Sequence, residues 1–207
     1  MQFSRLIISP HIDDEILGCG GILDASSFVL ECGVDDFHIV SRDERIEELS
    51  LASKYLGFNF KVLDGKVNHY NRRDFIEVFT KFINQIHPNE IFIPYPSYNQ
   101  DHQEIYQASI IALRPHDVNY LVPRVLVYEE TQVSDWDFGM SISHTFKPNF
   151  FKEIDIERKL KAYQMLKSQV RAFRSPDYLR EIAALRGHQS GLVYAEAFMC
   201  LRNVEHM

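Results

Sequence analysis

Short apolar runs alternate with longer amphipathic stretches over most of the chain, and this alternation constrains the fold more than any other feature. The amphipathic stretches carry apolar residues at helical spacing, while the apolar runs have the length and composition of strands. The predicted strands are Arg5–Ser9, Phe37–Ser41, Phe58–Leu63, Glu90–Pro94 and Arg124–Tyr128. The helices predicted between them are Asp43–Leu56, Arg73–Ile86 and Asp101–Leu113. Strand–helix alternation predicts an α/β fold with a mostly parallel sheet covered on both faces.

The last third of the chain has a different pattern. It contains two predicted helices, Asp155–Arg174 and Pro176–Leu185, followed by a strand-like run from Gly191 to Met199. No repeat, low-complexity segment or Ser/Gly linker divides the 207 residues. We therefore expect residues 1–207 to form one domain.

Composition excludes several classes of function. The chain has 22 Lys and Arg against 29 Asp and Glu, a net charge of −7, which does not favour nucleic-acid binding. Its apolar runs are far shorter than the roughly 20 residues of a membrane-spanning helix, and its first residues do not resemble a signal peptide. Three cysteines without a C-x-x-C pair indicate neither disulfides nor a cysteine zinc site. We expect a cytoplasmic protein that holds any metal by nitrogen and oxygen ligands.

Polar clusters follow two of the predicted strands. Residues 9–15 after the first strand read Ser-Pro-His-Ile-Asp-Asp-Glu, and residues 96–102 after the fourth read Pro-Ser-Tyr-Asn-Gln-Asp-His. Each cluster alone is explained by helix capping, because acidic residues and Asn favour the first turn of a helix. In open α/β sheets, however, ligands bind beyond the carboxyl ends of strands. Two His/Asp clusters at such ends therefore predict one shared site.

The spacing of these clusters predicts a metal site. His11 and Asp14 are three residues apart, so a helical turn would point both side chains the same way. With His102 they would form a two-His, one-carboxylate set that suits zinc or another divalent first-row metal, such as Fe²⁺. Asp13 would lie beside the metal as a general base for a metal-bound water, whose pKa falls toward about 7. The predicted chemistry is hydrolysis.

These motifs resemble the PIG-L/LmbE-type metal-dependent deacetylases. The resemblance begins with His11-Ile-Asp-Asp-Glu15 and the glycines that follow at 18, 20 and 21, where the family has H-P-D-D-E…GG. It continues in order over nearly the whole chain, through residues 45–57, 99–102, 146–150, 161–169 and 186–198. The resemblance implies a Rossmann-like, three-layer α/β/α sandwich and removal of N-acetyl groups from amino sugars, usually with zinc. It assigns His11, Asp14 and His102 as ligands and Asp13 as the base.

Two positions depart from the family pattern. Ile12 replaces the usual proline, which removes no ligand. Asn99 stands where many members have a histidine, and an amide can donate a hydrogen bond to an oxyanion but cannot deliver a proton. The leaving amine would then be protonated by Asp13, acting as both base and acid, or by His144 or His188. Surface or core histidines are the simpler interpretation of the last two.

The other polar and aromatic positions each have two interpretations. Asp101 is expected to orient a ligand or the loop rather than bind metal. Arg45 either holds a phosphate or hydroxyl of the substrate, as the matching arginine is thought to do in relatives, or pairs with Glu48 on the helix surface. Glu196 is either near the substrate or a charged edge residue. Loop aromatics suited to stacking on a sugar are Tyr95, Tyr98 and Trp136.

The glycines at 18, 20 and 21 do not fit the G-x-G-x-x-G spacing of a dinucleotide loop. Close packing of a helix on the sheet is the better explanation of these glycines. A methyltransferase or dinucleotide enzyme is accordingly disfavoured.

Two functional hypotheses remain. The first is a zinc-dependent hydrolase that removes the N-acetyl group from an amino sugar or glycoconjugate, with water activated by Asp13. The second is a catalytically weak protein that binds a sugar or nucleotide sugar on the same fold, and Asn99 is its best support. Either would have a small-molecule partner, and a homo-oligomer is compatible with both.

Overall fold

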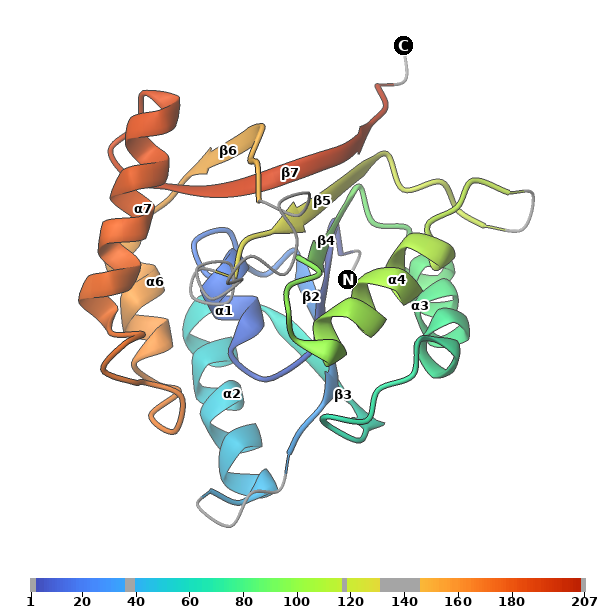
Figure 1. The fold of residues 1–207 in the computed structure, drawn as a ribbon, viewed down its shortest axis with the longest axis horizontal. Coiled ribbons are helices and arrows are strands. Elements are labelled where there is room, and N and C mark those ends of the chain that lie inside the picture. Colours follow the sequence, from blue (N-terminus) through green and yellow to red (C-terminus); the bar gives the residue numbers. More distant parts are fainter. Residues whose placement is uncertain (1–2, 36–39, 117–118, 131–145, 206–207) are drawn as a thin grey trace.

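The computed structural model describes residues 3–35, 40–116, 119–130 and 146–205, and it confirms the α/β prediction (Figure 1). The described strands form a single seven-stranded sheet. The strands are β1 (Arg5–Ser9), β2 (Ser27–Gly33), β3 (Asn59–Gly65), β4 (Glu90–Pro94), β5 (Arg124–Tyr128), β6 (Phe150–Glu153) and β7 (Ala195–Asn203). The helices are α1 (Asp14–Cys19), α2 (Arg42–Leu56), α3 (Arg72–Ile86), α4 (Gln100–Ala112), α6 (Ile156–Tyr163) and α7 (Pro176–Ser190).

The order of the strands places β1 and β4 side by side at the centre of the sheet. The order is β3-β2-β1-β4-β5-β7-β6, and the first five strands are parallel. Strand β7 runs antiparallel to β5, and β6 runs antiparallel to β7. The chain moves from β1 outward to β3 and then crosses back to β4 on the other side of β1. This reversal is the topological switch point at which open α/β sheets bind their ligands.

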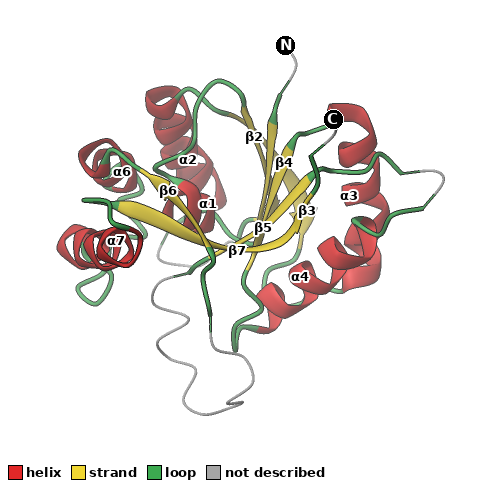
Figure 2. Cartoon of the chain, turned by 90° about the horizontal axis from the view of Figure 1, so that it is seen from above, coloured by secondary structure: helices red, strands yellow, loops and turns green. Residues whose placement is uncertain are grey.

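Helices cover both faces of the sheet, as Figure 2 shows, so the fold is a three-layer α/β/α sandwich. In β1, Ile7 packs into the core with α1, α2, α6 and α7, while Leu6 and Ile8 pack into the core with α3 and α4. Alternate residues of β4 and β5 divide between the two cores in the same way. Burial on both faces explains why these strands are almost continuously apolar.

Helix ends follow local capping chemistry. The Ser41 side chain accepts a hydrogen bond from the backbone N–H of Glu44 at the start of α2, and Gly57 ends that helix at φ 91°. Ser175 caps α7 in the same manner, and Gly191 ends it at φ 75°. Side-chain acceptors before a helix and glycine after it satisfy the terminal backbone groups, so these boundaries are written locally in the sequence.

Three predicted elements need correction. The predicted second strand, Phe37–Ser41, lies largely outside the described residues, and the strand observed between α1 and α2 is Ser27–Gly33. The long helix predicted from Asp155 to Arg174 ends at Tyr163, and turns follow it up to α7. The last strand has the predicted length but lies four residues later in the chain, at Ala195–Asn203 instead of Gly191–Met199. None of the described helices is long and apolar enough to cross a membrane.

The glycine-rich stretch serves close packing, as the sequence indicated. A Cβ atom on Gly18 would lie 2.2 Å from Cδ2 of Tyr128, whose ring is fully buried. The Tyr128 hydroxyl donates to the backbone carbonyl of Ile8 at 2.9 Å, which fixes the ring in place. Helix α1 can therefore lie against the sheet only because residue 18 has no side chain.

This contact predicts the sign of a glycine substitution. In an ordinary helix Gly→Ala stabilises by about 0.5–1 kcal/mol. We expect Gly18→Ala to destabilise the protein instead, by about 1–3 kcal/mol, because the buried Tyr128 ring must shift. Urea unfolding measures the change, and the exposed helix position Ser50→Ala is the control expected to stay near wild type. A Gly18→Ala protein as stable as wild type would contradict this packing.

Candidate metal centre and pocket

The site lies where β1 and β4 end, side by side at the switch point. The loop after β1 carries His11, Asp13 and Asp14, and the loop after β4 carries Asn99 at the start of α4, with His102 in its first turn. Parallel pairing of β1 with β4 brings the two loops together although the histidines are 91 residues apart in the chain. The structure thus brings together the two polar clusters that were predicted to share a site.

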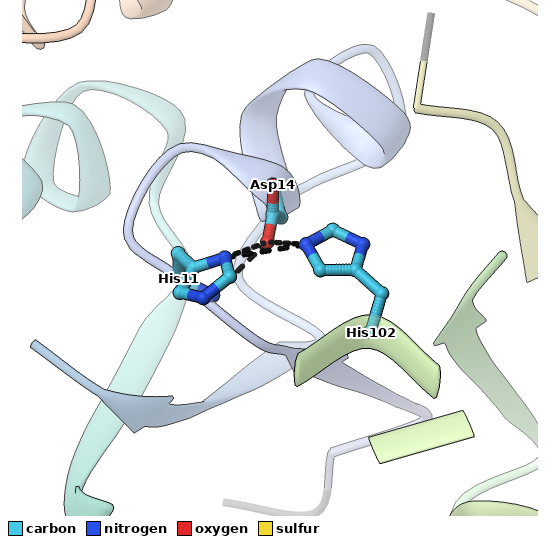
Figure 3. Close-up of side chains that lie close together, drawn as sticks. All are labelled: His11, Asp14 and His102. Carbon is cyan, nitrogen blue, oxygen red and sulfur yellow. Dashed lines mark hydrogen bonds and ion pairs between the residues drawn. The ribbon is translucent and has the colours of Figure 1, made fainter. Parts of the chain in front are cut away.

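His11, Asp14 and His102 point their polar atoms at one another (Figure 3). His11 Nδ1 lies 3.3 Å from Asp14 Oδ2, His102 Nε2 lies 3.3 Å from the same oxygen, and the two nitrogens are 3.2 Å apart. Zinc bonds of about 2.0–2.1 Å in a tetrahedron separate two ligand atoms by about 3.3–3.4 Å. The triangle of ligand atoms therefore has the size that a tetrahedral metal requires.

The turn that positions these ligands differs from the predicted one. His11 precedes α1 rather than lying in it, and the helix begins only at Asp14. The backbone N–H of His11 donates to Asp14 Oδ2 at 3.0 Å, and the Asp14 N–H donates to the His11 carbonyl at 3.2 Å. A hydrogen-bonded turn, not helical periodicity, orients both side chains.

In each histidine, a carboxylate contacts the ring nitrogen that faces away from the cluster. His11 Nε2 lies 3.0 Å from Asp101 Oδ2, and His102 Nδ1 lies 2.6 Å from Glu130 Oε1. Such contacts fix which ring nitrogen faces a metal, and metal-binding histidines usually have them. The expected orienting role of Asp101 fits this contact. Glu130 was missed, because it follows β5 and no sequence spacing links it to the two loops.

Electrostatics favour the charged forms of the cluster. Burial lowers the pKa of His11, but hydrogen bonds to Asp101 and Asp14 outweigh burial and raise this pKa to about 9. Burial also opposes ionisation of Asp14, but His102 and His11 hold the pKa of Asp14 well below its usual range. A metal cation would take the place of the protons on the two histidines.

Asp13 lies in the same pocket with an unusual backbone. Its φ is 130°, in the region that residues other than glycine rarely adopt, and its N–H donates to Glu15 Oε2 at 2.9 Å. Burial raises the pKa of Asp13 to about 6, although the guanidinium of Arg174, 2.8 Å away, opposes this rise. A carboxylate with a pKa near neutrality is suited to accept and return a proton.

Asn99 is the first residue before α4, and its side chain has a structural task. Asn99 Oδ1 accepts a hydrogen bond from the backbone N–H of Asp101 at 2.9 Å. Asp101 Oδ2 in turn accepts the N–H of Asn68 at 2.6 Å in addition to contacting His11. Asn99 thus caps the helix that presents the second loop.

The cluster opens onto a pocket of about 300 Å³. Lining residues that the sequence singled out are His11, Asp13, Asp14, Arg45, Asn99 and His102. Lining residues not assigned a role from sequence are Ile12, Asp35, Val67, Asn68, Glu130, Gln169 and Arg174. Arg45 pairs with Asp35 at 2.5 Å rather than with Glu48, which instead accepts from Ser168. The Arg45 side chain therefore lies at the pocket wall and not on the helix surface.

Other sequence candidates lie elsewhere. Glu196 is buried in an ion pair with Lys159 at 2.6 Å, away from this pocket. Tyr95 is buried against Phe146, and His188 is exposed on α7. None of these lines the pocket, nor does the partly exposed Tyr98. Trp136 and His144 lie outside the described residues.

Solved structures match the whole fold. The conserved protein TT1542 from Thermus thermophilus is 20% identical, with 100% of this chain and 98% of that chain covered and a TM-score of 0.80. N,N'-diacetylchitobiose deacetylase from Pyrococcus horikoshii is 21% identical, with 95% and 83% covered and a TM-score of 0.71. Deacetylases of teicoplanin and of the A40926 pseudoaglycone match at TM-scores of 0.67 to 0.74. The chain has the fold of these deacetylases.

The same fold carries a different activity as well. The 4-carboxy-2-hydroxymuconate hydratase GalB from Pseudomonas putida KT2440 is 19% identical, with 100% of both chains covered and a TM-score of 0.80. A profile of a YvbH-like oligomerisation region matches residues 41–85, which span α2, β3 and most of α3. No curated protein sequence matches the chain significantly. The resemblance predicted from sequence is thus confirmed for the fold, and activity must be argued from the site.

The contact between Glu130 and His102 predicts a loss of metal affinity. Replacing a carboxylate that orients a metal-binding histidine typically weakens binding about 10–100-fold. We expect Glu130→Gln to weaken Zn²⁺ binding by this factor in a competition titration with a chelator. The neighbouring Glu129→Gln is the matched control, because Glu129 pairs with Arg186 outside the metal cluster. Equal affinities of the two variants would exclude the orienting role.

Proton release on metal binding is a second prediction. The raised pKa of His11, about 9, means that this ring is protonated at pH 7 and must lose its proton to bind a metal. Apparent Zn²⁺ affinity should therefore rise with pH from 6.5 toward 9, by about tenfold per pH unit for each proton displaced. Calorimetry at pH 7 in buffers of different ionisation enthalpy counts these protons. A binding enthalpy that does not depend on the buffer would show that the rings are already neutral.

Proposed function

We propose that this protein is a metal-dependent hydrolase that removes the N-acetyl group from an amino sugar or glycoconjugate. The observation that carries the proposal is the His11–Asp14–His102 triangle with the Asp13 carboxylate beside it in one pocket. A triangle of this size, made of two imidazole nitrogens and one carboxylate oxygen, suits Zn²⁺, with Fe²⁺ as an alternative. The fold shared with several deacetylases supports the same activity.

The residues divide the reaction between them. When bound, the metal supplies a Lewis acid that polarises the acetamide carbonyl and acidifies a water molecule. Asp13 accepts the proton of that water as its oxygen attacks the carbonyl carbon. In this proposal the Asn99 amide nitrogen donates a hydrogen bond to the developing oxyanion. Asp13 then returns its proton to the leaving nitrogen, the C–N bond breaks, and acetate and a free amine result.

We assign the returned proton to Asp13, the same group that accepted it. Among the described residues that line the pocket, the only histidines are the two proposed ligands, and Asn99 has no proton to give at neutral pH. A pKa of about 6 lets Asp13 exist as carboxylate before the attack and as acid after it. One group serving as both base and acid fits that value.

A hydratase is the second candidate function. GalB covers the whole chain, and the same groups that activate water for attack on an amide would activate it for addition to a C=C bond. In that reaction Arg45, which lines the pocket, would pair with a carboxylate of the substrate in place of Asp35. The third candidate, a weakly catalytic protein that binds a sugar or nucleotide sugar, rests on Asn99 in place of a histidine.

One panel of assays separates the three. Metal-loaded protein is incubated with N-acetylglucosamine, N,N'-diacetylchitobiose and UDP-N-acetylglucosamine, and acetate and free amine are measured. A parallel set follows the ultraviolet absorbance of 4-carboxy-2-hydroxymuconate. Acetate release supports the deacetylase, and loss of absorbance supports the hydratase. Tight sugar binding without turnover of either kind would favour the binding protein and overturn the proposal.

Two substitutions test the mechanism. Asp13→Ala should keep the metal and lower the rate of acetate release about 10²–10⁴-fold, because the base is lost and the ligands are not. His102→Ala should lose metal and activity together. Metal content by elemental analysis and acetate release are measured on the same preparations. Full activity of a metal-replete Asp13→Ala protein would rule out the assigned base.

A further inference from the structure

The chain between α6 and α7, residues 164–175, reaches back to Asp13. Arg174 Nη2 donates to Asp13 Oδ2 at 2.8 Å. The hydrogen-bonding surroundings of the Gln169 amide place its nitrogen 3.1 Å from the same oxygen, while its oxygen accepts from Arg45 and from Ser168. Two donors from one segment therefore converge on one oxygen of the proposed base.

This segment is itself fixed to the body of the protein. The Tyr163 hydroxyl lies 3.0 Å from the carbonyl oxygen of Gln169 and 2.9 Å from that of Arg174. Glu48 accepts from the backbone N–H and the hydroxyl of Ser168, at 2.9 and 2.5 Å. Gln169 is buried and Arg174 nearly so. The segment can therefore hold the Asp13 side chain in a definite place.

The two donors leave the other oxygen of the carboxylate for chemistry. Within the described part of the chain, no hydrogen bond is made to Asp13 Oδ1. Since Asp13 lines the pocket beside the three proposed ligands, Oδ1 is the oxygen that can meet a water molecule there. A carboxylate gripped at one oxygen loses its freedom to rotate, which is an advantage for a base that must meet a water at one point.

We propose that Arg174 and Gln169 are positioning residues that hold Asp13 Oδ2 so that Oδ1 receives the proton of the attacking water. This inference rests on the proposed function, because it takes Asp13 as the base. It departs from a substrate-binding role for Arg174, since this guanidinium donates to a carboxylate of the protein itself and to the Gln169 carbonyl. Arg45, in contrast, pairs with Asp35 and not with Asp13.

Kinetics distinguish positioning from substrate binding. Arg174→Ala should lower kcat about 10²-fold for whichever N-acetylated sugar of the panel the wild type hydrolyses, with KM changed less than about threefold, because a misplaced base affects the chemical step. Gln169→Leu should give a smaller fall of the same kind. Guanidinium chloride at tens of millimolar should restore part of the activity of Arg174→Ala and none of Asp13→Ala. Metal content should equal that of wild type in all three variants.

The matched control is Arg171→Ala, an exposed arginine of the same segment whose side chain donates to the carbonyl of Val170. It should keep both kcat and KM, and guanidinium should not change its rate. A rise in KM of Arg174→Ala with kcat retained would overturn the proposal and assign Arg174 to substrate binding. Wild-type kinetics of both Arg174→Ala and Gln169→Leu would overturn it as well.

A measurement without turnover tests the same contact. In metal-free protein, Arg174→Met should lower the urea midpoint of unfolding in the wild-type background but much less in the Asp13→Asn background, since the ion pair is already lost there. Equal shifts in both backgrounds would show that Arg174 does not act through Asp13. Should Arg174→Ala not fold, Arg174→Lys and Gln169→Leu take its place in the kinetic test.

The two hypotheses fail in different ways. If the wild type releases no acetate from any sugar of the panel, the proposed function fails, and the urea cycle still decides whether the contact exists. If the wild type is active and Asp13→Ala is not, while Arg174→Ala keeps wild-type kcat, only the positioning role fails.

Discussion

The parallel pairing of β1 with β4 is the constraint on which the site depends. Residues 5–7 of β1 pair with residues 90–92 of β4, so both strands end at the same edge of the sheet. The chain leaves β1 toward β2 and leaves β4 toward β5, and the two loops therefore diverge and leave space between them. Side chains on both loops can enter that space without competing for it. The His11–Asp14–His102 cluster therefore depends on the order of the strands as well as on the identity of its residues.

Burial of several carboxylates close together costs electrostatic free energy. The side chains of Asp13, Asp14 and Glu130 are buried at the pocket, and those of Glu15 and Asp101, which contact Asp13 and His11, are buried as well. Isolated buried carboxylates are costly unless they are paired or protonated. Burial raises the pKa of Glu15 to about 8 and, with the nearby Asp14 charge, that of Glu130 to about 7. The raised pKa values favour the protonated forms of some of these carboxylates. The positive charge of Arg174 and the two histidines offsets the charge of others, and these histidines are the proposed metal ligands.

The sequence predicted the layers of the fold and the three residues of the His11–Asp14–His102 cluster because both follow local patterns. Strands buried on both faces, such as Glu90–Pro94, appear as apolar runs, and the polar residues that follow them mark the functional edge. The strand Ser27–Gly33 was missed because it contains Glu31, which is fully buried although charged residues rarely are. Burial raises the pKa of Glu31 well above its usual range.

The residues that support the ligands were harder to predict. Glu130 and Arg174 come from the ends of β5 and of the α6–α7 connection, far from both motifs in the sequence. Helical periodicity carried the predicted α6 through to Arg174, whereas the helix ends at Tyr163, whose hydroxyl contacts the carbonyls of the turns that follow. Only that early end returns the chain to Asp13. Contacts of this kind join residues that are far apart in the chain, so no sequence motif predicts them.

Asn99 shows how the second loop accommodates its departure from the family pattern. A histidine at this position would be a poor N-cap, whereas the Asn99 oxygen accepts the N–H of Asp101 and thereby starts α4. Asp101 then holds His11, so the amide is connected through two contacts to a proposed metal ligand. Asn99 thus supports the geometry of the loop, and its amide has no proton to give at neutral pH. In the proposed reaction Asp13 therefore carries out both proton transfers. The hydrogen bonds from Arg174 and Gln169 to one of its oxygens then keep this single base in position for both steps.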